Sequence, residues 1–191
     1  TFGDEPHYLM ITHSLVHDRD LNQYNNYLNQ DYRNFYKFVL KPKPSDIISK
    51  NEIYSQGLGV VFPLILAPFY CILNYNGVLI EIALITALLL FVIYRLSFMF
   101  THNVTASILN TYIAGFSLPF AVYSSQVYPD IPATLFVLTA LESFLLYRND
   151  KTNRILLLKI ILSLILVAFL KFRYAVIAFS FALPALIEVK K

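Results

Sequence analysis

Three groups of polar residues could do chemistry in a chain that is otherwise rich in apolar residues. They are the acid pair Asp4 and Glu5, the acid Asp130 at the end of the stretch SSQVYPD, and the basic stretch KFRY at 171–174. A carboxylate can take a proton from a hydroxyl group, and it becomes a stronger base where burial near a membrane surface desolvates it. Lys171 and Arg173 can neutralise a phosphate as it gains charge. These residues suit a reaction in which a hydroxyl is deprotonated and a phosphate leaves.

The composition predicts a membrane protein. Of the 191 residues, 57% are hydrophobic and 14% are charged, and the mean hydropathy is +0.57, which lies outside the usual range of soluble domains. The net charge is only +3 and the basic residues are scattered, so nothing favours a nucleic-acid partner. The chain begins within a polar segment, and we interpret it as a fragment that has lost its first membrane-spanning helix.

Residues 1–77 are predicted to form an extracytoplasmic loop. Tyr8, Ile11 and Leu15 recur at helical spacing, which predicts a short amphipathic helix at 6–17. The apolar stretch 58–77 contains Pro63 and Pro68, and each proline removes a backbone hydrogen bond that lipid cannot replace. We therefore expect 58–77 to lie in the membrane interface or to re-enter from it.

Residues 78–191 are predicted to form the membrane domain of an all-α, multi-pass helical bundle. Five apolar runs approach the length of roughly 17–25 residues that a spanning helix needs. These runs lie at 78–97, 104–123, 131–147, 155–170 and 175–189. This topology places Asp4, Asp130 and the 171–174 segment on the same outer face, and the loop basic residues Arg148, Lys151 and Arg154 on the cytoplasmic side.

Five stretches, taken in order, resemble bacterial members of the GT-C superfamily, which are integral-membrane glycosyltransferases that use polyprenyl-phosphate sugars. They are DEPHYLMITHSL from Asp4, the D-x-D-L pattern from Asp18, GLGVVFPLILAPFY from Gly57, SSQVYPDIPATL from Ser124 and LKFRYA from Leu170. The likeness is to the broad group that includes protein O-mannosyltransferase-like and lipid A aminoarabinose transferase-like enzymes. It covers nearly the whole chain, although the remaining helices and any C-terminal domain of these enzymes are missing.

The resemblance implies an inverting transfer of a sugar from a polyprenyl-phosphate carrier to an unidentified acceptor at a bacterial inner (cytoplasmic) membrane. Asp4 takes the place of the general base in the first extracytoplasmic loop, with Glu5 as its neighbour. Asp130 is similar to a second outer-face acid at the start of a later helix. Lys171, Arg173 and Tyr174 are the residues that we expect to bind the lipid phosphate.

Each of these residues also has a structural explanation. Asp4 and Asp130 could cap helices, which is a frequent use of aspartate. Lys171 and Arg173 stand where basic side chains reach from a helix end to the membrane interface. Within the spans, Glu142 and Lys159 lie at matched distances from the turn between their helices, so we predict that they form an ion pair across that hairpin.

Three histidines near the acid pair raise the question of a metal. His13 and His17 stand one helical turn apart, and His7 precedes them. The spacing H-x5-H-x3-H is not a recognised zinc signature, so solvation of a polar helix face explains these residues better and we predict no metal site. The cofactor requirement stays open, because chemistry in which a phosphate leaves often uses a divalent cation, here near Asp4.

Two other classes of function compete with the glycosyltransferase. A multi-pass transporter or flippase would line several helices with polar residues at the membrane midplane, whereas the chain has only Ser107, Asn110 and Thr111 in one helix. A non-catalytic membrane subunit would leave the outer-face acids without a purpose. The glycosyltransferase is therefore the leading hypothesis.

Overall fold

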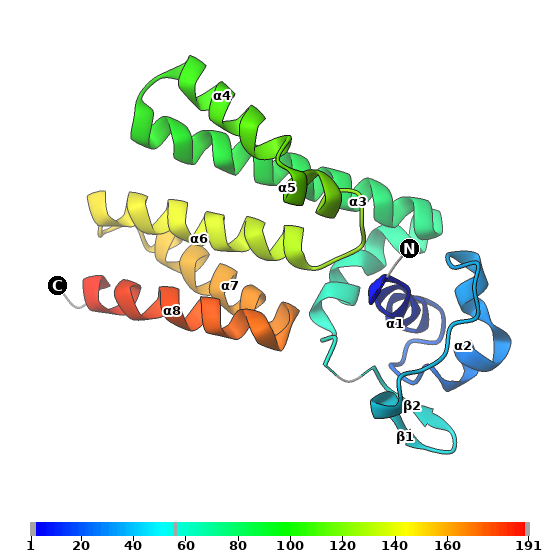
Figure 1. Ribbon diagram of the computed structural model, residues 1–191. Helices are drawn as coiled ribbons and strands as arrows, with labels where there is room; N and C mark the ends of the chain where they lie inside the picture. Colours follow the sequence, from blue (N-terminus) through cyan, green and yellow to red (C-terminus); the bar gives the residue numbers. More distant parts are fainter. Residues whose placement is uncertain (1–2, 56, 190–191) are drawn as a thin grey trace. The chain divides into compact units, whose positions relative to one another are not determined.

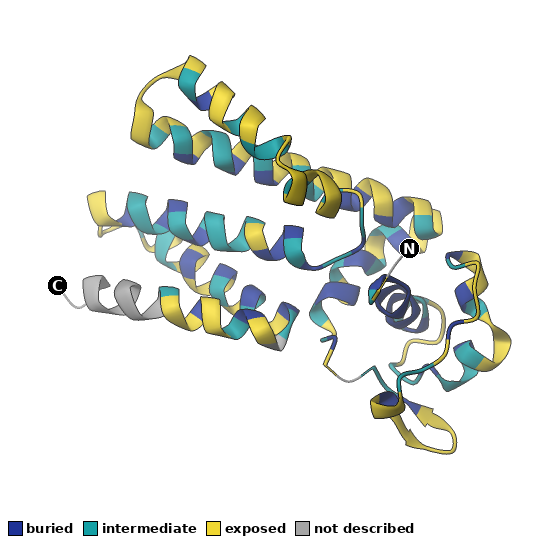
Figure 2. Ribbon diagram, viewed as in Figure 1, coloured by how far each residue is buried: buried dark blue, intermediate teal, exposed yellow. Residues whose placement is uncertain are grey.

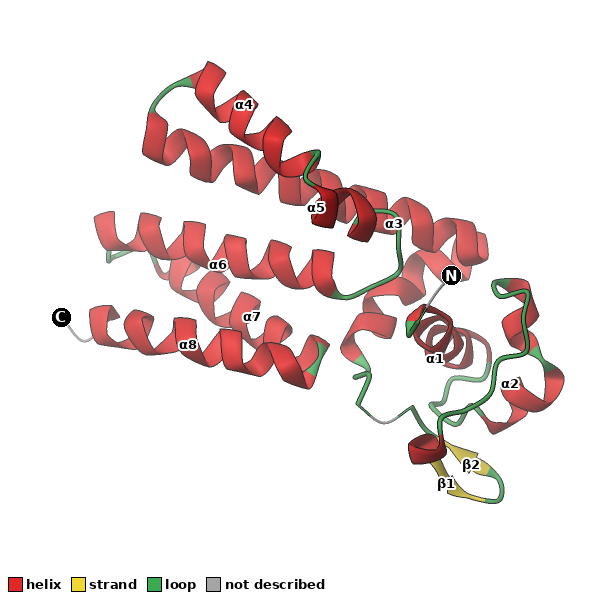
Figure 3. Ribbon diagram, in the orientation of Figure 1, coloured by secondary structure: helices red, strands yellow, loops and turns green. Residues whose placement is uncertain are grey.

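A computed structural model describes residues 3–55 and 57–189, and the described chain is mostly helical, at 74% (Figures 1 and 3). This confirms the predicted all-α class. The chain divides into two compact units. We call Thr1–Ile82 together with Ser125–Tyr128 the N-terminal unit, and Ala83–Ser124 together with Pro129–Lys191 the helical unit.

The described residues form eight α-helices, two short 3-10 helices and one β-hairpin. In chain order these are α1 Glu5–His17, α2 Tyr24–Asn29, η1 Asp31–Asn34, η2 Pro44–Asp46, β1 Ile47–Ser49, β2 Glu52–Ile53, α3 Val61–Thr101, α4 Val104–Gly115, α5 Leu118–Tyr123, α6 Asp130–Asn149, α7 Arg154–Leu170 and α8 Phe172–Val189. The two strands pair in antiparallel fashion, with Ile47 opposite Ile53.

Helix α1 forms the core of the N-terminal unit. It begins where predicted, with Pro6 in its first turn, where the missing N–H of proline costs nothing. Its residues from Glu5 to Thr12 are all buried, so this part has no exposed polar face (Figure 2). Tyr8 packs edge-on against Phe62 of α3, with ring centroids 5.1 Å apart. The helix predicted at 6–17 exists, but its part up to Thr12 is buried on all sides instead of being amphipathic.

Helix α3 contains a sharp kink that separates its first part from the rest. Asn74 has φ 52° and ψ −138°, which are not helical values. The part from 61 to 73 is about 20 Å long at 1.5 Å per residue, less than the roughly 30 Å of a bilayer's hydrocarbon core. Gly77 makes the kink sterically feasible, because a Cβ atom there would lie 2.7 Å from the carbonyl carbon of Phe69. Whether 58–77 crosses the membrane stays a prediction.

Two described helices, α3 and α6, are long and apolar enough to cross a membrane. The described residues therefore contain two candidate spans, and the predicted five spans are not shown. The predicted span at 104–123 is wrong as a single helix, because it breaks at Phe116 and Ser117 into α4 and α5. Ser117 is extended, and Pro119 has no N–H to continue the hydrogen-bond ladder from α4.

The predicted ion pair between Glu142 and Lys159 is also wrong. Glu142 is buried on α6, and its Oε1 lies 2.7 Å from Nε of Arg95 on α3. The Nε–H bond does not point at this oxygen, so the contact is an ion pair without a hydrogen bond to Oε1. Lys159 is exposed on α7. Matched depth along a hairpin did not identify the partner, because the direction of each side chain around its helix decides which charges meet.

Candidate functional site

Asp4 stands directly before α1, but its side chain does not cap the helix. Its backbone carbonyl accepts hydrogen bonds from the N–H groups of His7 and Tyr8, at 3.1 Å each. The carboxylate instead accepts a hydrogen bond from Nζ of Lys43, with 2.7 Å between Nζ and Oδ1. The Asp4 and Lys43 side chains are 31% and 39% exposed, so this ion pair is open to an incoming molecule. The capping explanation for the carboxylate therefore fails.

Lys43 is a residue that the sequence reasoning missed. It lies between Pro42 and Pro44, and a residue that precedes proline is driven into extended backbone. Lys43 has φ −68° and ψ 145°, as that restriction requires. The two prolines thus hold the backbone of the lysine that meets Asp4.

Glu5 differs from Asp4 in its access to solvent. Its side chain is directed into the N-terminal unit, with the residue only 3% exposed. The hydroxyl of Tyr75 lies 3.5 Å from Glu5 Oε1, a long and weak hydrogen bond. Of the two adjacent acids, Asp4 is therefore the one that a substrate from outside the unit can reach.

His7 lies beside the Asp4 and Lys43 pair and is buried. Its Nδ1 is 3.0 Å from the hydroxyl of Tyr27. Burial lowers the pKa of His7, the Lys43 charge lowers it further, and the carboxylates of Asp46 and Asp4 oppose this change. His7 is thus a neutral, hydrogen-bonded core residue, and its predicted solvation on a polar face is wrong.

His13 and His17 form a second histidine group on α1, with ring centroids 4.4 Å apart. The Nδ1 atom of His13 is 2.9 Å from the hydroxyl of Tyr70, and its Nε2 is 3.7 Å from Asp31. Burial, and then the neighbouring His17, lower the pKa of His13. Among the residues that the structure describes, no three His, Cys, Asp or Glu side chains are arranged to hold a metal ion.

The loop that precedes Asp130 reaches the start of α1 within the N-terminal unit. The hydroxyl of Tyr128 lies so close to Gly3 that a Cβ atom at that position would collide with it. Gly3 also has φ 63°, a conformation that favours glycine. Tyr128 belongs to SSQVYPD and Gly3 precedes Asp4, so two of the three sequence groups meet in this unit.

In the helical unit, Asp130 joins two residues of the third sequence group. It is the first residue of α6, and its Oδ1 accepts hydrogen bonds of 2.8 Å from Nη2 of Arg173 and from the hydroxyl of Tyr174. Arg173 also donates to the Tyr174 hydroxyl, at 2.8 Å. Tyr174 is buried, so it fixes the direction of the Asp130 carboxylate. Lys171 lies at the junction of α7 and α8 in extended backbone.

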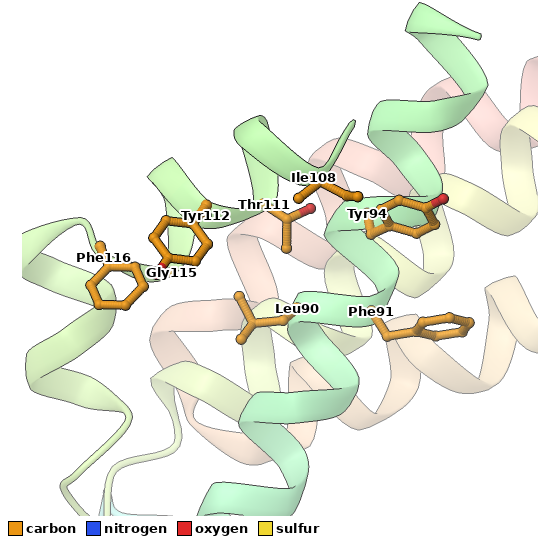
Figure 4. A pocket seen from close by; sticks show the side chains of 8 residues that line it. All are labelled: Leu90, Phe91, Tyr94, Ile108, Thr111, Tyr112, Gly115 and Phe116. Carbon is orange, nitrogen blue, oxygen red and sulfur yellow. The ribbon is translucent and has the colours of Figure 1, made fainter. Parts of the chain in front are cut away.

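Described residues of the helical unit line several hollows, of which two bear on the candidate site. One has a volume of about 190 Å³ and is bordered by Asp130, the start of α6 and α5. The other is an apolar groove of about 400 Å³ between α3 and α4 (Figure 4). Its lining residues are Leu90, Phe91, Tyr94, Ile108, Thr111, Tyr112, Gly115 and Phe116. The stacked rings of Tyr112 and Phe116, 4.6 Å apart, border this groove.

The predicted site residues thus fall into two clusters, one in each unit. Asp4 and Glu5 belong to the cluster of the N-terminal unit, to which Lys43 and His7 are added. Asp130, Arg173 and Tyr174 form the cluster of the helical unit. Comparisons of this chain with known protein families, with characterised protein sequences and with solved structures found no match.

Proposed function

We propose that the chain belongs to a membrane glycosyltransferase of the GT-C type, which transfers a sugar from a polyprenyl-phosphate carrier to an acceptor at the outer face. The observation that carries this proposal is the contact between Tyr128 and Gly3. It brings Tyr128 of SSQVYPDIPATL to the residue directly before DEPHYLMITHSL, and these are the two stretches that hold the candidate acids in the resemblance.

In the proposed reaction, Asp4 is the general base. It takes the proton of an acceptor hydroxyl as that oxygen forms a bond to the anomeric carbon of the sugar. The bond from this carbon to the phosphate oxygen breaks on the opposite face, so the configuration inverts and the electron pair stays with the lipid phosphate. Lys43 competes with the acceptor for the Asp4 carboxylate, so their ion pair has to open before the proton moves.

Arg173 and Lys171 are the proposed partners of the lipid phosphate. The Arg173 guanidinium is paired with Asp130, and 56% of the surface of the Arg173 side chain is exposed. An exposed guanidinium can exchange a carboxylate for a phosphate, because both anions accept two parallel hydrogen bonds from it. Tyr174 holds the Asp130 carboxylate in place during this exchange.

A lipid carrier and a multi-pass topology are further parts of the proposal. The apolar groove between α3 and α4 can take a length of isoprenoid chain (Figure 4). The 17-residue helix α7 is at the lower limit for a spanning helix, and α8 has 18 residues. With α3 and α6 these helices would form most of a bundle in a bacterial inner membrane.

The test is a pair of substitutions in the full-length protein. We expect Asp4→Asn to lower sugar transfer by about a hundredfold or more while donor binding survives, because asparagine keeps the size of the side chain but takes no proton. We expect Arg173→Ala to weaken donor binding. Glu52→Gln is the matched control, since it changes an exposed acid in the same unit as Asp4.

Transfer from a radiolabelled polyprenyl-phosphate sugar and equilibrium binding of that donor separate the two roles. Suppose that Asp4→Asn keeps near-normal turnover while Glu5→Gln or Asp130→Asn loses it. The role of general base would then belong to that other acid. Equal loss in Glu52→Gln would mean that the effect of Asp4→Asn is not specific to the base.

A transporter or flippase is the second candidate, and the broken helix favours it. Discontinuous helices such as α4 and α5 often surround the binding site of a transporter. Proteoliposomes that contain a fluorescent polyprenyl phosphate and no acceptor distinguish the two functions. Movement of this lipid between leaflets faster than in protein-free liposomes would favour the flippase.

A further inference from the structure

The hollow beside Asp130 lies wholly within the helical unit, at the point where α5 and the start of α6 face Leu89 of α3. Its volume is about 190 Å³. A water molecule takes roughly 30 Å³ in the liquid, so the hollow has the room of about six water molecules. That is the space of one sugar ring and too little for an oligosaccharide or for a lipid chain of useful length.

The walls of the hollow combine aromatic rings with oxygen atoms. Phe120 and Tyr123 come from one turn of α5, and Ser117, Asp130 and Thr134 add two hydroxyls and a carboxylate. One face of a pyranose ring presents weakly positive C–H groups, which are attracted to the negative face of an aromatic ring. The hydroxyls at the edge of the sugar need strong acceptors, and a carboxylate is the strongest that a side chain offers.

Asp130 is held in a way that leaves one of its oxygens for a ligand. Both Arg173 and Tyr174 donate to Oδ1. Across the described residues, Oδ2 receives no hydrogen bond from a side chain or from the backbone. Because two donors fix Oδ1, the carboxylate cannot rotate freely, and Oδ2 keeps one direction.

We propose that this hollow binds a single pyranose ring. The rings of Phe120 and Tyr123 cover its C–H face, and Oδ2 of Asp130 accepts a hydrogen bond from a ring hydroxyl. A phosphate attached to the sugar would then find the Arg173 guanidinium, which already contacts Asp130. This proposal rests on the proposed function, and it names the place where the sugar of the substrate is held.

The test is direct binding of simple sugars to the full chain in lipid nanodiscs, measured by saturation-transfer-difference NMR. The probes are the methyl glycosides of mannose, glucose and galactose at millimolar concentration. We expect Tyr123→Ala to weaken binding about tenfold, as loss of an aromatic contact predicts, and Tyr123→Phe to keep it. Asp130→Asn should also weaken binding, since an amide is a poorer acceptor than a carboxylate.

Phe169→Ala is the control, because it removes an exposed aromatic ring of the helical unit that lines neither the hollow nor the apolar groove. Circular dichroism of each variant shows whether the helices remain. No saturation transfer to any of the three glycosides in the unmodified chain overturns the proposal, and so does equal binding by Tyr123→Ala, Tyr123→Phe and the unmodified chain.

This binding experiment needs no acceptor and no transfer, so its result is independent of the glycosyltransferase test. A chain that binds the glycosides through Tyr123 but transfers no sugar refutes the proposed function and retains the sugar site. A chain that transfers sugar but binds the glycosides equally with and without the Tyr123 ring places the sugar elsewhere.

Discussion

Asp4 and Lys43 form an ion pair in which neither side chain is buried, with 31% and 39% of their surfaces exposed. Exposed pairs of this kind usually contribute no more than about 1 kcal/mol, because water and salt screen the charges. The pair can therefore open at little cost in free energy. This property suits a carboxylate that has to exchange a lysine for a substrate hydroxyl.

We predict that a double-mutant cycle with Asp4→Asn and Lys43→Gln gives a coupling free energy below about 1 kcal/mol. Thermal or chemical unfolding of the four proteins in detergent measures it. A coupling of several kcal/mol would mean that the pair is a fixed structural link, and Asp4 would then be a poor candidate for the base.

His7 and His13 predict a loss of stability in mild acid. Burial lowers the pKa of both residues below their ordinary value of 6.5, so the unfolded chain binds protons at a higher pH than the folded chain does. Their stabilising contribution is complete above pH 6.5 and is lost as the pH falls through the range below it.

The melting temperature of the chain, measured between pH 7.5 and 5, tests this effect. We expect the melting temperature to fall less steeply with pH in His7→Asn, where an amide replaces the ring. Asp31 and Asp18 favour protonation of His13. If acidification raised the melting temperature, these carboxylates would outweigh burial and the prediction would fail.

At the scale of the elements, the kink of α3 depends on Gly77. A methyl group there would meet the backbone of Phe69, with 2.7 Å to its carbonyl carbon. Backbone cannot move aside as a flexible side chain can, so we predict that Gly77→Ala lowers the free energy of unfolding by about 1–3 kcal/mol.

Gly115→Ala is the matched comparison, because its new methyl group would meet only the end of the Leu90 side chain, at 3.1 Å. We expect a smaller loss there. Chemical unfolding of both variants in the same detergent measures the two losses in the free energy of unfolding. Equal losses would show that the kink tolerates a side chain at position 77.

At the scale of the whole molecule, the membrane topology is the main open prediction. Asp4, Asp130 and the 171–174 segment are expected on the same face of the membrane, because an even number of spans separates them only if 58–77 does not cross. Cysteines introduced at positions 4, 130 and 171 should all react with an impermeant thiol reagent from the outer side.

The exposed thiol of Cys71 has to be removed first, as Cys71→Ala. A cysteine at position 150, in the turn between α6 and α7, should react only from the cytoplasmic side and serves as the control. Labelling of positions 4 and 130 from opposite sides would end the catalytic hypothesis.

Local patterns predicted the elements better than they predicted the partners of charged residues. The helix from Glu5 was recognisable from Pro6 and the spacing of Tyr8, Ile11 and Leu15. Counting spans placed Asp130 and Arg173 on the same membrane face, which stays a prediction, whereas the direct hydrogen bond between their side chains is a finding of the structure. Lys43 was missed because its ion pair with Asp4 crosses a long loop, and no local pattern encodes such a contact.

The break between α4 and α5 was hidden for a different reason. The run 104–123 is apolar on both sides of Ser117, so hydropathy alone predicts a single continuous helix there. Pro119 was the available signal, since proline ends a helix more reliably than polarity does.

The contact between Tyr128 and Gly3 also determines how early the N-terminal unit can finish folding during synthesis. A ribosome completes residue 3 long before residue 128, so the N-terminal unit lacks this partner during most of synthesis. Contacts between residues so distant in the sequence form late, because the entropy of closing the intervening loop has to be overcome first. The segment that carries Asp4 therefore remains incompletely folded until α3, α4 and α5 have been synthesised and Tyr128 can contact Gly3.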